Sequence, residues 1–448
     1  MLTGPVDEDS DVRAALDWFG MLSGDAAAFR HRLEKAQVSY CKSAAQPANY
    51  GQDLELGDLD HDKVASYLAQ ADALLHNRGA YDLVLGARIV PFIKQLGVGI
   101  KLLRQIPGAA ERASRMLRQK TVDPESAIFE LAAAVRYAQL GYSVQFIPEA
   151  PGGERRPDFA IDRGRFSAEV ECKRLRKGEY EKGESRYQRQ IFRALAQLID
   201  DHRLSIHVDV VYTRELKDVP LDYLAKWAEA SLSCRILLPE GFPWKDEFGE
   251  GRIKPANLNA VHRDTRDSSL LFGPKMARLL VGAPVSEGAY NMTAGAKRDP
   301  RDARFVELID FGSVVTWQCI AAGSINARAR YVQSKLADID RQMKSSLIGI
   351  AHIAMDAERD TLAADLRRKR NLEAVSDFAF ESRMAAMRLH YFVPRVTEIH
   401  SWLIDETVDF FNRSGISPKL PRKIFSRSRP LNNNLPAWHQ SLPLPPPI

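Results

Sequence analysis

The stretch that most constrains the fold of this chain is residues 157–173, with the sequence PDFAIDRGRFSAEVECK. Strand-forming residues stand on both sides of an Arg-Gly pair at 163–164, which predicts two short strands joined by a tight turn. Successive side chains of a strand point to opposite faces, so the charged residues of the second strand share one face: Glu169, Glu171 and Lys173. A face with two carboxylates and an amine cannot be a hydrophobic core, and we expect it in a water-filled cleft.

Asp158 opens the first of these strands and adds a third carboxylate to the same neighbourhood. Two or three oxygen ligands for a hard cation would then converge beside Lys173. Mg²⁺ keeps several waters and takes one or two carboxylates together with substrate phosphate, so it suits such a set. The sequence therefore predicts a site for Mg²⁺ or Mn²⁺ on this hairpin.

Pro157-Asp158 followed by Glu171-Cys172-Lys173 resembles the signature of the PD-(D/E)XK nucleases, the restriction-endonuclease-like superfamily. The core of that family runs helix, three antiparallel strands, helix, strand. Here an N-terminally capped helix is expected from Asp123 to Leu140, followed by strands at 142–147 and in the hairpin. A polar helix is expected at 179–202 and a buried closing strand at 205–212. The resemblance covers about 90 residues, 121–213.

The resemblance implies roles for five residues. Asp158 and Glu171 would bind the metal, with the backbone carbonyl of Cys172 as a further ligand, and Lys173 would act on the attacking water and the phosphate. An acid on the first helix often supports the metal in this family, which makes Glu130 a candidate; pairing of Glu130 with an arginine is the alternative. The Cys172 thiol itself alternates away from the acids and is expected in the core.

Basic and amide side chains flank the motif on both sides. Arg residues precede Asp158 in a Gly-rich loop, and a charged segment with aromatics and amides follows Lys173. As a group they are candidates for contacts to nucleic acid, with a solvated surface as the alternative for each one: Arg155, Arg156, Arg174, Arg176, Lys177, Gln188 and Gln190.

The chain of 448 residues is long enough for several cores. We predict an α/β fold with a mixed sheet, in which a restriction-endonuclease-like αβββαβ core is flanked by other segments. These are a helical N-terminal domain at 1–118, the core at 119–214, a loop-rich insertion at 215–304, an α/β extension of the core or second layer at 305–415, and a tail at 416–448. The basic helix at 109–120 is read either as facing phosphate or as a solvated linker.

The net charge of +5 is located in the tail, which holds five Lys or Arg, eight Pro and no acid. We expect this tail to have no core of its own. No apolar run reaches membrane-spanning length and the first residues do not resemble a signal peptide, so a cytoplasmic protein without membrane contact is expected.

The expected function is a metal-dependent nuclease that hydrolyses phosphodiester bonds, with DNA as the first choice of partner and an endonuclease role in defence against foreign DNA as an analogy. The alternative is a catalytically inactive nuclease-fold module for nucleic-acid binding or assembly. A structural cluster of ion pairs is a third interpretation. Homo-oligomer and partner protein both stay open.

Overall fold

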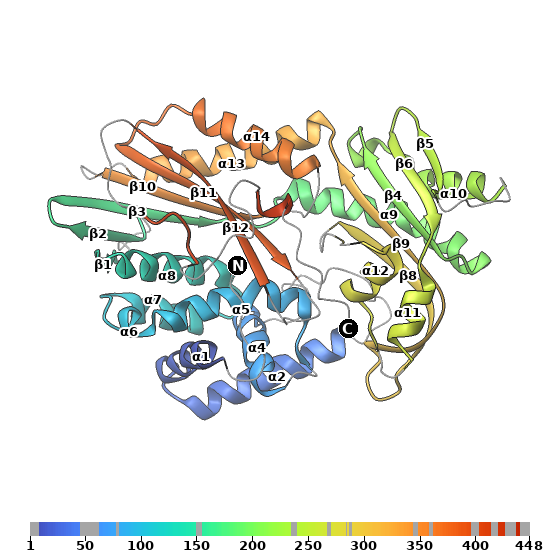
Figure 1. Ribbon diagram of the computed structural model, residues 1–448. Helices are drawn as coiled ribbons and strands as arrows, with labels where there is room; N and C mark the ends of the chain where they lie inside the picture. The colour runs from blue at the N-terminus through green and yellow to red at the C-terminus, as the bar shows by residue number, and fades with distance from the viewer. Residues whose placement is uncertain are drawn as a thin grey trace.

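The described residues of the computed structural model form thirteen α-helices and two mixed β-sheets (Figure 1). They are residues 9–44, 62–77, 80–148, 155–233, 240–266, 270–283, 285, 289–343, 348–357, 362–395, 403–413, 420–425 and 436–439. Among them, no helix is both long and apolar enough to cross a membrane.

The first sheet, sheet A, carries the motif hairpin. Its strand order is β1 (Ser143–Phe146), β2 (Phe159–Arg163), β3 (Phe166–Arg174), β10 (Ile348–Asp356), β11 (Met384–Arg395) and β12 (Leu403–Asn412). The predicted hairpin of β2 and β3 forms, with Phe159 opposite Val170 and a turn at Gly164, whose φ of 63° favours glycine. β10 runs parallel to β3 and to β11, whereas the outer pairs are antiparallel.

Helices cover both faces of sheet A (Figure 1). One face packs on α8 (Pro124–Gln139), which begins at the N-cap Asp123 as predicted and buries a broad apolar side including Ile128, Leu131 and Val135. Below α8 lie the N-terminal helices, with bounds Ser10–Leu22 (α1), Ala26–Ala44 (α2), Lys63–His76 (α4), Leu83–Val98 (α5), Ile100–Leu103 (α6) and Ala109–Arg118 (α7). The other face packs on α13 (Ala322–Gln342) and α14 (Leu362–Ser376).

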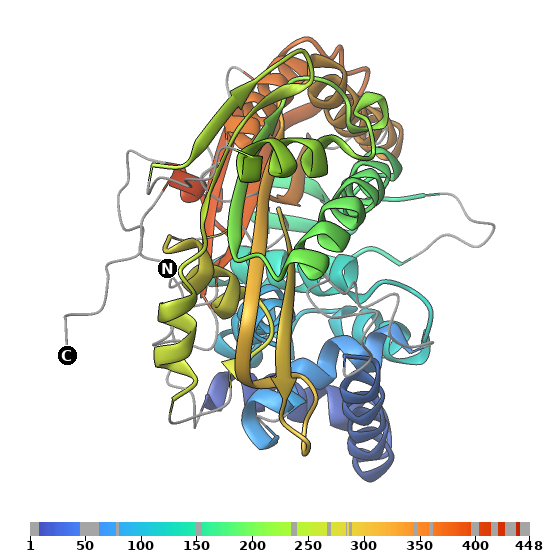
Figure 2. The ribbon, with the colours of Figure 1, turned by 90° about the vertical axis from the view of Figure 1, so that its right-hand side faces the viewer.

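The second sheet, sheet B, forms from the segment between β3 and α13, with the order β5–β6–β4–β9–β7 and β8 also paired to β9. Its strands are β4 (Ile206–Tyr212), β5 (Phe242–Lys245), β6 (Gly249–Pro255), β7 (Leu270–Leu271), β8 (Tyr290–Arg298) and β9 (Phe305–Cys319). In Figure 2 the long β9 runs from the level of the N-terminal helices to that of α13. Its helices are α9 (Glu179–His202), α10 (Tyr223–Ser233), α11 (Leu258–Asp264) and α12 (Pro274–Val281).

The predicted closing strand at 205–212 forms, but the prediction that it closes the motif sheet is wrong. β4 lies in sheet B between β6 and β9, and β10 occupies the place beside β3. Both strands are buried apolar runs, so the sequence pattern does not distinguish which of them pairs with β3. The segment 215–304, expected to be rich in loops, contributes four strands and three helices to sheet B and its cover.

The described parts of the tail pack into cores formed by the rest of the chain, a contribution that the expectation of a tail without a core of its own does not include. Ile424 and Phe425 lie in the core under sheet A, and their backbone N–H groups donate to the buried carboxylate of Glu406 on β12. Trp438 is fully buried against sheet A, and its indole donates to Asp365 at 2.9 Å. Charge and proline content do not reveal such anchors, because a few large side chains are enough.

Replacing Trp438 with Ala should therefore lower the free energy of unfolding by about 3–5 kcal/mol, as for other fully buried large aromatics. Urea unfolding followed by circular dichroism measures the change. Trp438→Phe is the matched control, because it keeps most of the ring volume and loses mainly the indole hydrogen bond, which is worth about 1 kcal/mol. An unchanged unfolding midpoint for Trp438→Ala would show that the tail is not docked in solution.

Candidate active site

The motif acids meet where β2 begins and β3 ends. The Asp158 N–H donates to the Val170 carbonyl at 3.0 Å, which continues the ladder and sets Asp158 opposite Glu171. The Cys172 N–H then donates to Asp158 Oδ2 at 2.8 Å. This backbone donor fixes the position of the Asp158 carboxylate.

The side chains of β3 alternate as predicted, but the polar face is more enclosed than a water-filled cleft. Val170 and Cys172 enter the core beneath α8, on the opposite face of the strand from Glu171. Glu171 is only 1% exposed, and it forms an ion pair with Lys173, whose side chain is 25% exposed. The hairpin therefore holds its carboxylate in a nearly closed site that opens to solvent at the lysine.

Glu130 on α8 joins this cluster through an arginine that the motif does not contain. Arg112 on α7 donates from Nε to Glu130 Oε2 at 2.5 Å and from Nη2 to Asp158 Oδ1 at 2.7 Å. Glu130 therefore pairs with an arginine, as the alternative interpretation expected, and it also lies near Asp158. Its support of a metal stays a prediction. The basic helix at 109–120 carried the only sequence signal for Arg112.

Electrostatics in the cluster raise the pKa of each of its three carboxyl groups while no metal is bound. Burial, reinforced by the neighbouring Asp158, raises the pKa of Glu171 from its ordinary value of 4.5 to about 8. Burial followed by Asp158 raises the pKa of Glu130, and burial raises that of Asp158 against the opposing charges of Arg112 and Lys173. Although burial opposes it, the Glu171 carboxylate raises the pKa of Lys173, so that amine stays charged.

The donors present fit a divalent cation held mainly by water and substrate. Glu171 Oε2 is buried and has no hydrogen-bond partner, which is costly for a carboxylate oxygen unless a cation takes it up. Within the described residues, no group of three or more Asp, Glu, His or Cys is arranged as a complete metal cage. Mg²⁺ does not require one, because one or two carboxylates suffice. Asp158, Glu171 and the backbone carbonyl of Cys172 remain the candidate ligands.

Three of the predicted nucleic-acid contacts are engaged elsewhere in the protein. Arg174 is buried, where it pairs with Asp356 at 2.6 Å and with Glu125 at 3.4 Å. Arg176 pairs with Asp123, the N-cap of α8. Gln188 is fully buried and donates to Asn291 of β8 at 3.2 Å, so it faces sheet B. These side chains stabilise the fold around the site.

The other predicted contacts lie nearer to solvent. Arg155 and Arg156 are exposed just before Asp158, and Gln190 is exposed on α9. Lys177 lines a small cavity of about 40 Å³ with Leu85, Arg88, Ile89, Glu125, Arg176 and Asp356.

The raised pKa of Glu171 makes the stability of the metal-free protein depend on pH. The folded state keeps a proton on Glu171 up to about pH 8, whereas the unfolded state releases it near pH 4.5. Because the native state binds more protons between these values, the free energy of unfolding should fall as the pH rises from about 5 to 8. Urea unfolding in EDTA should show this slope reduced in Glu171→Gln, and equal slopes would contradict the assignment.

No protein-family model, curated protein or solved structure matches this chain. What these residues do is therefore inferred from their own contacts and from the motif.

Proposed function

We propose that this chain is a divalent-metal-dependent nuclease that hydrolyses phosphodiester bonds, with DNA as substrate and internal cleavage as the mode. The observation that carries the proposal is the convergence of Asp158, Glu171 and Lys173 at one end of the β2–β3 hairpin, with one oxygen of Glu171 buried and unpaired. Two carboxylates beside a charged amine are suited to a hydrated Mg²⁺ or Mn²⁺ and an anionic substrate.

The strand order supports a restriction-endonuclease-like core as part of this proposal. α8, β1, β2 and β3 follow one another as in that family, and β10 lies beside β3 and parallel to it. β10 would then take the place of the last core strand, with sheet B inserted between. The N-terminal helices and sheet B would be additions to the core.

Each side chain of the site has a role in this chemistry. A bound metal would polarise the phosphoryl oxygen and lower the pKa of its water. Asp158 and Glu171 would hold it, while Cys172 keeps Asp158 in place through its N–H. The charged Lys173 would orient the attacking water and stabilise charge on the phosphate. Glu130 and Arg112 would position Asp158.

A second candidate is a catalytically inactive module that binds nucleic acid or assembles with other proteins. The contacts that favour it are those of Arg112 and Lys173, which already neutralise carboxylates of the cluster. A purely structural ion-pair cluster would show the same contacts. Cleavage and binding assays on matched variants separate these functions.

Asp158→Asn, Glu171→Gln and Lys173→Ala should each reduce cleavage of plasmid DNA by roughly 10²-fold or more, because each removes stabilisation of the transition state. Gel assays with Mg²⁺ or Mn²⁺ and with EDTA, on plasmid and on single-stranded DNA and RNA, measure the rates. Affinity for the substrate should fall much less, since other cationic contacts remain.

Glu169→Gln is the control for these three variants, because it removes a carboxylate from the same strand two residues before Glu171 and outside the motif. It should keep partial activity. A wild-type protein that binds nucleic acid and cuts none of these substrates with either metal would refute the enzymatic function and favour the binding module.

A further inference from the structure

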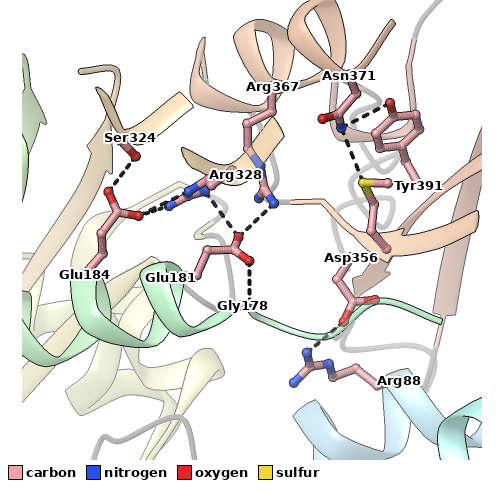
Figure 3. Close-up of polar contacts among 11 residues, drawn as sticks. Arg88, Gly178, Glu181, Glu184, Ser324, Arg328, Asp356, Arg367, Asn371 and Tyr391 are labelled. Atoms are coloured by element: carbon pink, nitrogen blue, oxygen red, sulfur yellow. Dashed lines mark hydrogen bonds and ion pairs between the residues drawn. The ribbon is translucent and has the colours of Figure 1, made fainter. Parts of the chain in front are cut away.

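The helix that follows the site, α9, is held rigidly at its beginning. It starts at Glu179, shortly after Lys173, and two of its carboxylates are held in ion pairs (Figure 3). Glu184 accepts from Arg328 Nε at 3.1 Å and from Ser324 Oγ at 2.5 Å, both on α13. Glu181 accepts from Arg367 of α14 at 2.7 Å and from the Gly178 N–H at 3.0 Å. Glu179, the other acid of the first turn, is exposed and pairs with Lys182 at 2.9 Å.

The inward face of α9 is fixed along its length by sheet B. Ile191, Leu195 and Ile199 are fully buried in the core of that sheet, and Gln188 lies beside Asn291. The rotation of the helix about its own axis is therefore set. The side chains on the solvent-facing side of α9 therefore point in one fixed direction.

Between residues 185 and 199 the outward face of α9 is cationic and contains no acid, whereas the exposed acids Glu179, Asp200 and Asp201 lie at the ends of the helix. Arg186, Arg189 and Arg193 are exposed at three- and four-residue spacing, which places them on one side of the helix over about 10 Å. Tyr187, 39% exposed, and Gln190 lie beside them. We call these five residues the α9 stripe. Residues 185–199 include no Asp or Glu, and none of the three arginines forms an ion pair or hydrogen bond with any described residue.

An exposed helix usually mixes charges of both signs, which keeps the surface soluble and pairs neighbours at three or four residues. The α9 stripe departs from this pattern, while the chain as a whole is nearly balanced, with 63 basic and 58 acidic residues. Arginines with a tyrosine and an amide are the side chains that contact phosphate and sugar in nucleic-acid complexes. The cationic stripe is therefore complementary in charge to the polyanionic backbone of a nucleic acid.

We propose that the α9 stripe binds the sugar–phosphate backbone of the nucleic-acid substrate and positions it for the site at Asp158, Glu171 and Lys173. This inference rests on the proposed function and names the surface that would hold its substrate. The attachment of α9 through Glu181 and Glu184 fixes the orientation of the stripe on the helix that follows β3 in the chain.

The test compares two triple variants that lose the same charge from exposed helix positions. Arg186→Gln, Arg189→Gln and Arg193→Gln together remove the cations of the stripe, and Arg30→Gln, Lys35→Gln and Lys42→Gln remove three exposed cations of α2. Fluorescence anisotropy in EDTA, with labelled duplex and single-stranded DNA of about 30 nucleotides, gives affinities from roughly 50 to 300 mM salt. Circular dichroism and melting temperature check that both variants fold.

The stripe variant should bind at least about 10-fold more weakly, and the slope of log affinity against log salt should decrease by roughly two to three for duplex DNA. The α2 variant should stay within about 2-fold of wild type. Equal affinities of the two variants, or a wild-type protein that binds neither probe, would refute the proposal that the stripe binds the nucleic-acid backbone. If the stripe variant keeps wild-type affinity and still cleaves DNA, the proposed role of the stripe in binding is refuted, and the proposed nuclease activity is retained. If binding depends on the stripe but the wild-type protein does not cleave DNA, the binding role of the stripe is supported and the nuclease activity is refuted.

Discussion

The parallel pairing of β3 with β10 joins the two halves of sheet A and connects the site to the helices around it. It joins strands that are far apart in the sequence and places Glu171 beside Ala351 in one ladder. At the ends of the two strands, Arg174 pairs with Asp356, which also pairs with Arg88 of α5 at 2.7 Å. The same pairing brings α13 and α14 over the sheet, and these helices supply Arg328 and Arg367 that hold α9. The site, the helix beyond it and the N-terminal helices are thus fixed together.

The second constraint is electrostatic. Three carboxylates, those of Glu130, Asp158 and Glu171, lie in a space that contains two neutralising cations, Arg112 and Lys173. Burial raises the pKa of all three acids, so the cluster without metal holds protons more tightly than free carboxyl groups do. A divalent cation would replace those protons and satisfy the unpaired oxygen of Glu171. In the proposed function, metal binding would offset the unfavourable free energy of burying the acids, and this gain would strengthen the affinity of the site for the metal.

Local pattern was enough to predict the hairpin, its turn and the capped helix before it, because alternation and capping act between neighbours in sequence. Long-range pairing was not predictable in the same way. β4 and β10 are both buried apolar strands, and only three-dimensional packing selects β10 as the neighbour of β3. The contacts of Gln188 and Arg112 were also not predictable from local pattern. Gln188 is a polar residue that is buried against sheet B, and Arg112 is a basic helix residue that reaches two buried acids.

Metal binding at Asp158 and Glu171 can be measured with Mn²⁺ by electron paramagnetic resonance, in which the six-line signal of free Mn²⁺ disappears as the ion binds. The proposed site predicts that the wild-type protein without nucleic acid removes this signal, and that Asp158→Asn and Glu171→Gln bind Mn²⁺ more weakly. Loss of the signal should be accompanied by proton release at neutral pH, because the acids give up their protons to the metal. A free Mn²⁺ signal that wild type and both variants leave equally unchanged would contradict the account.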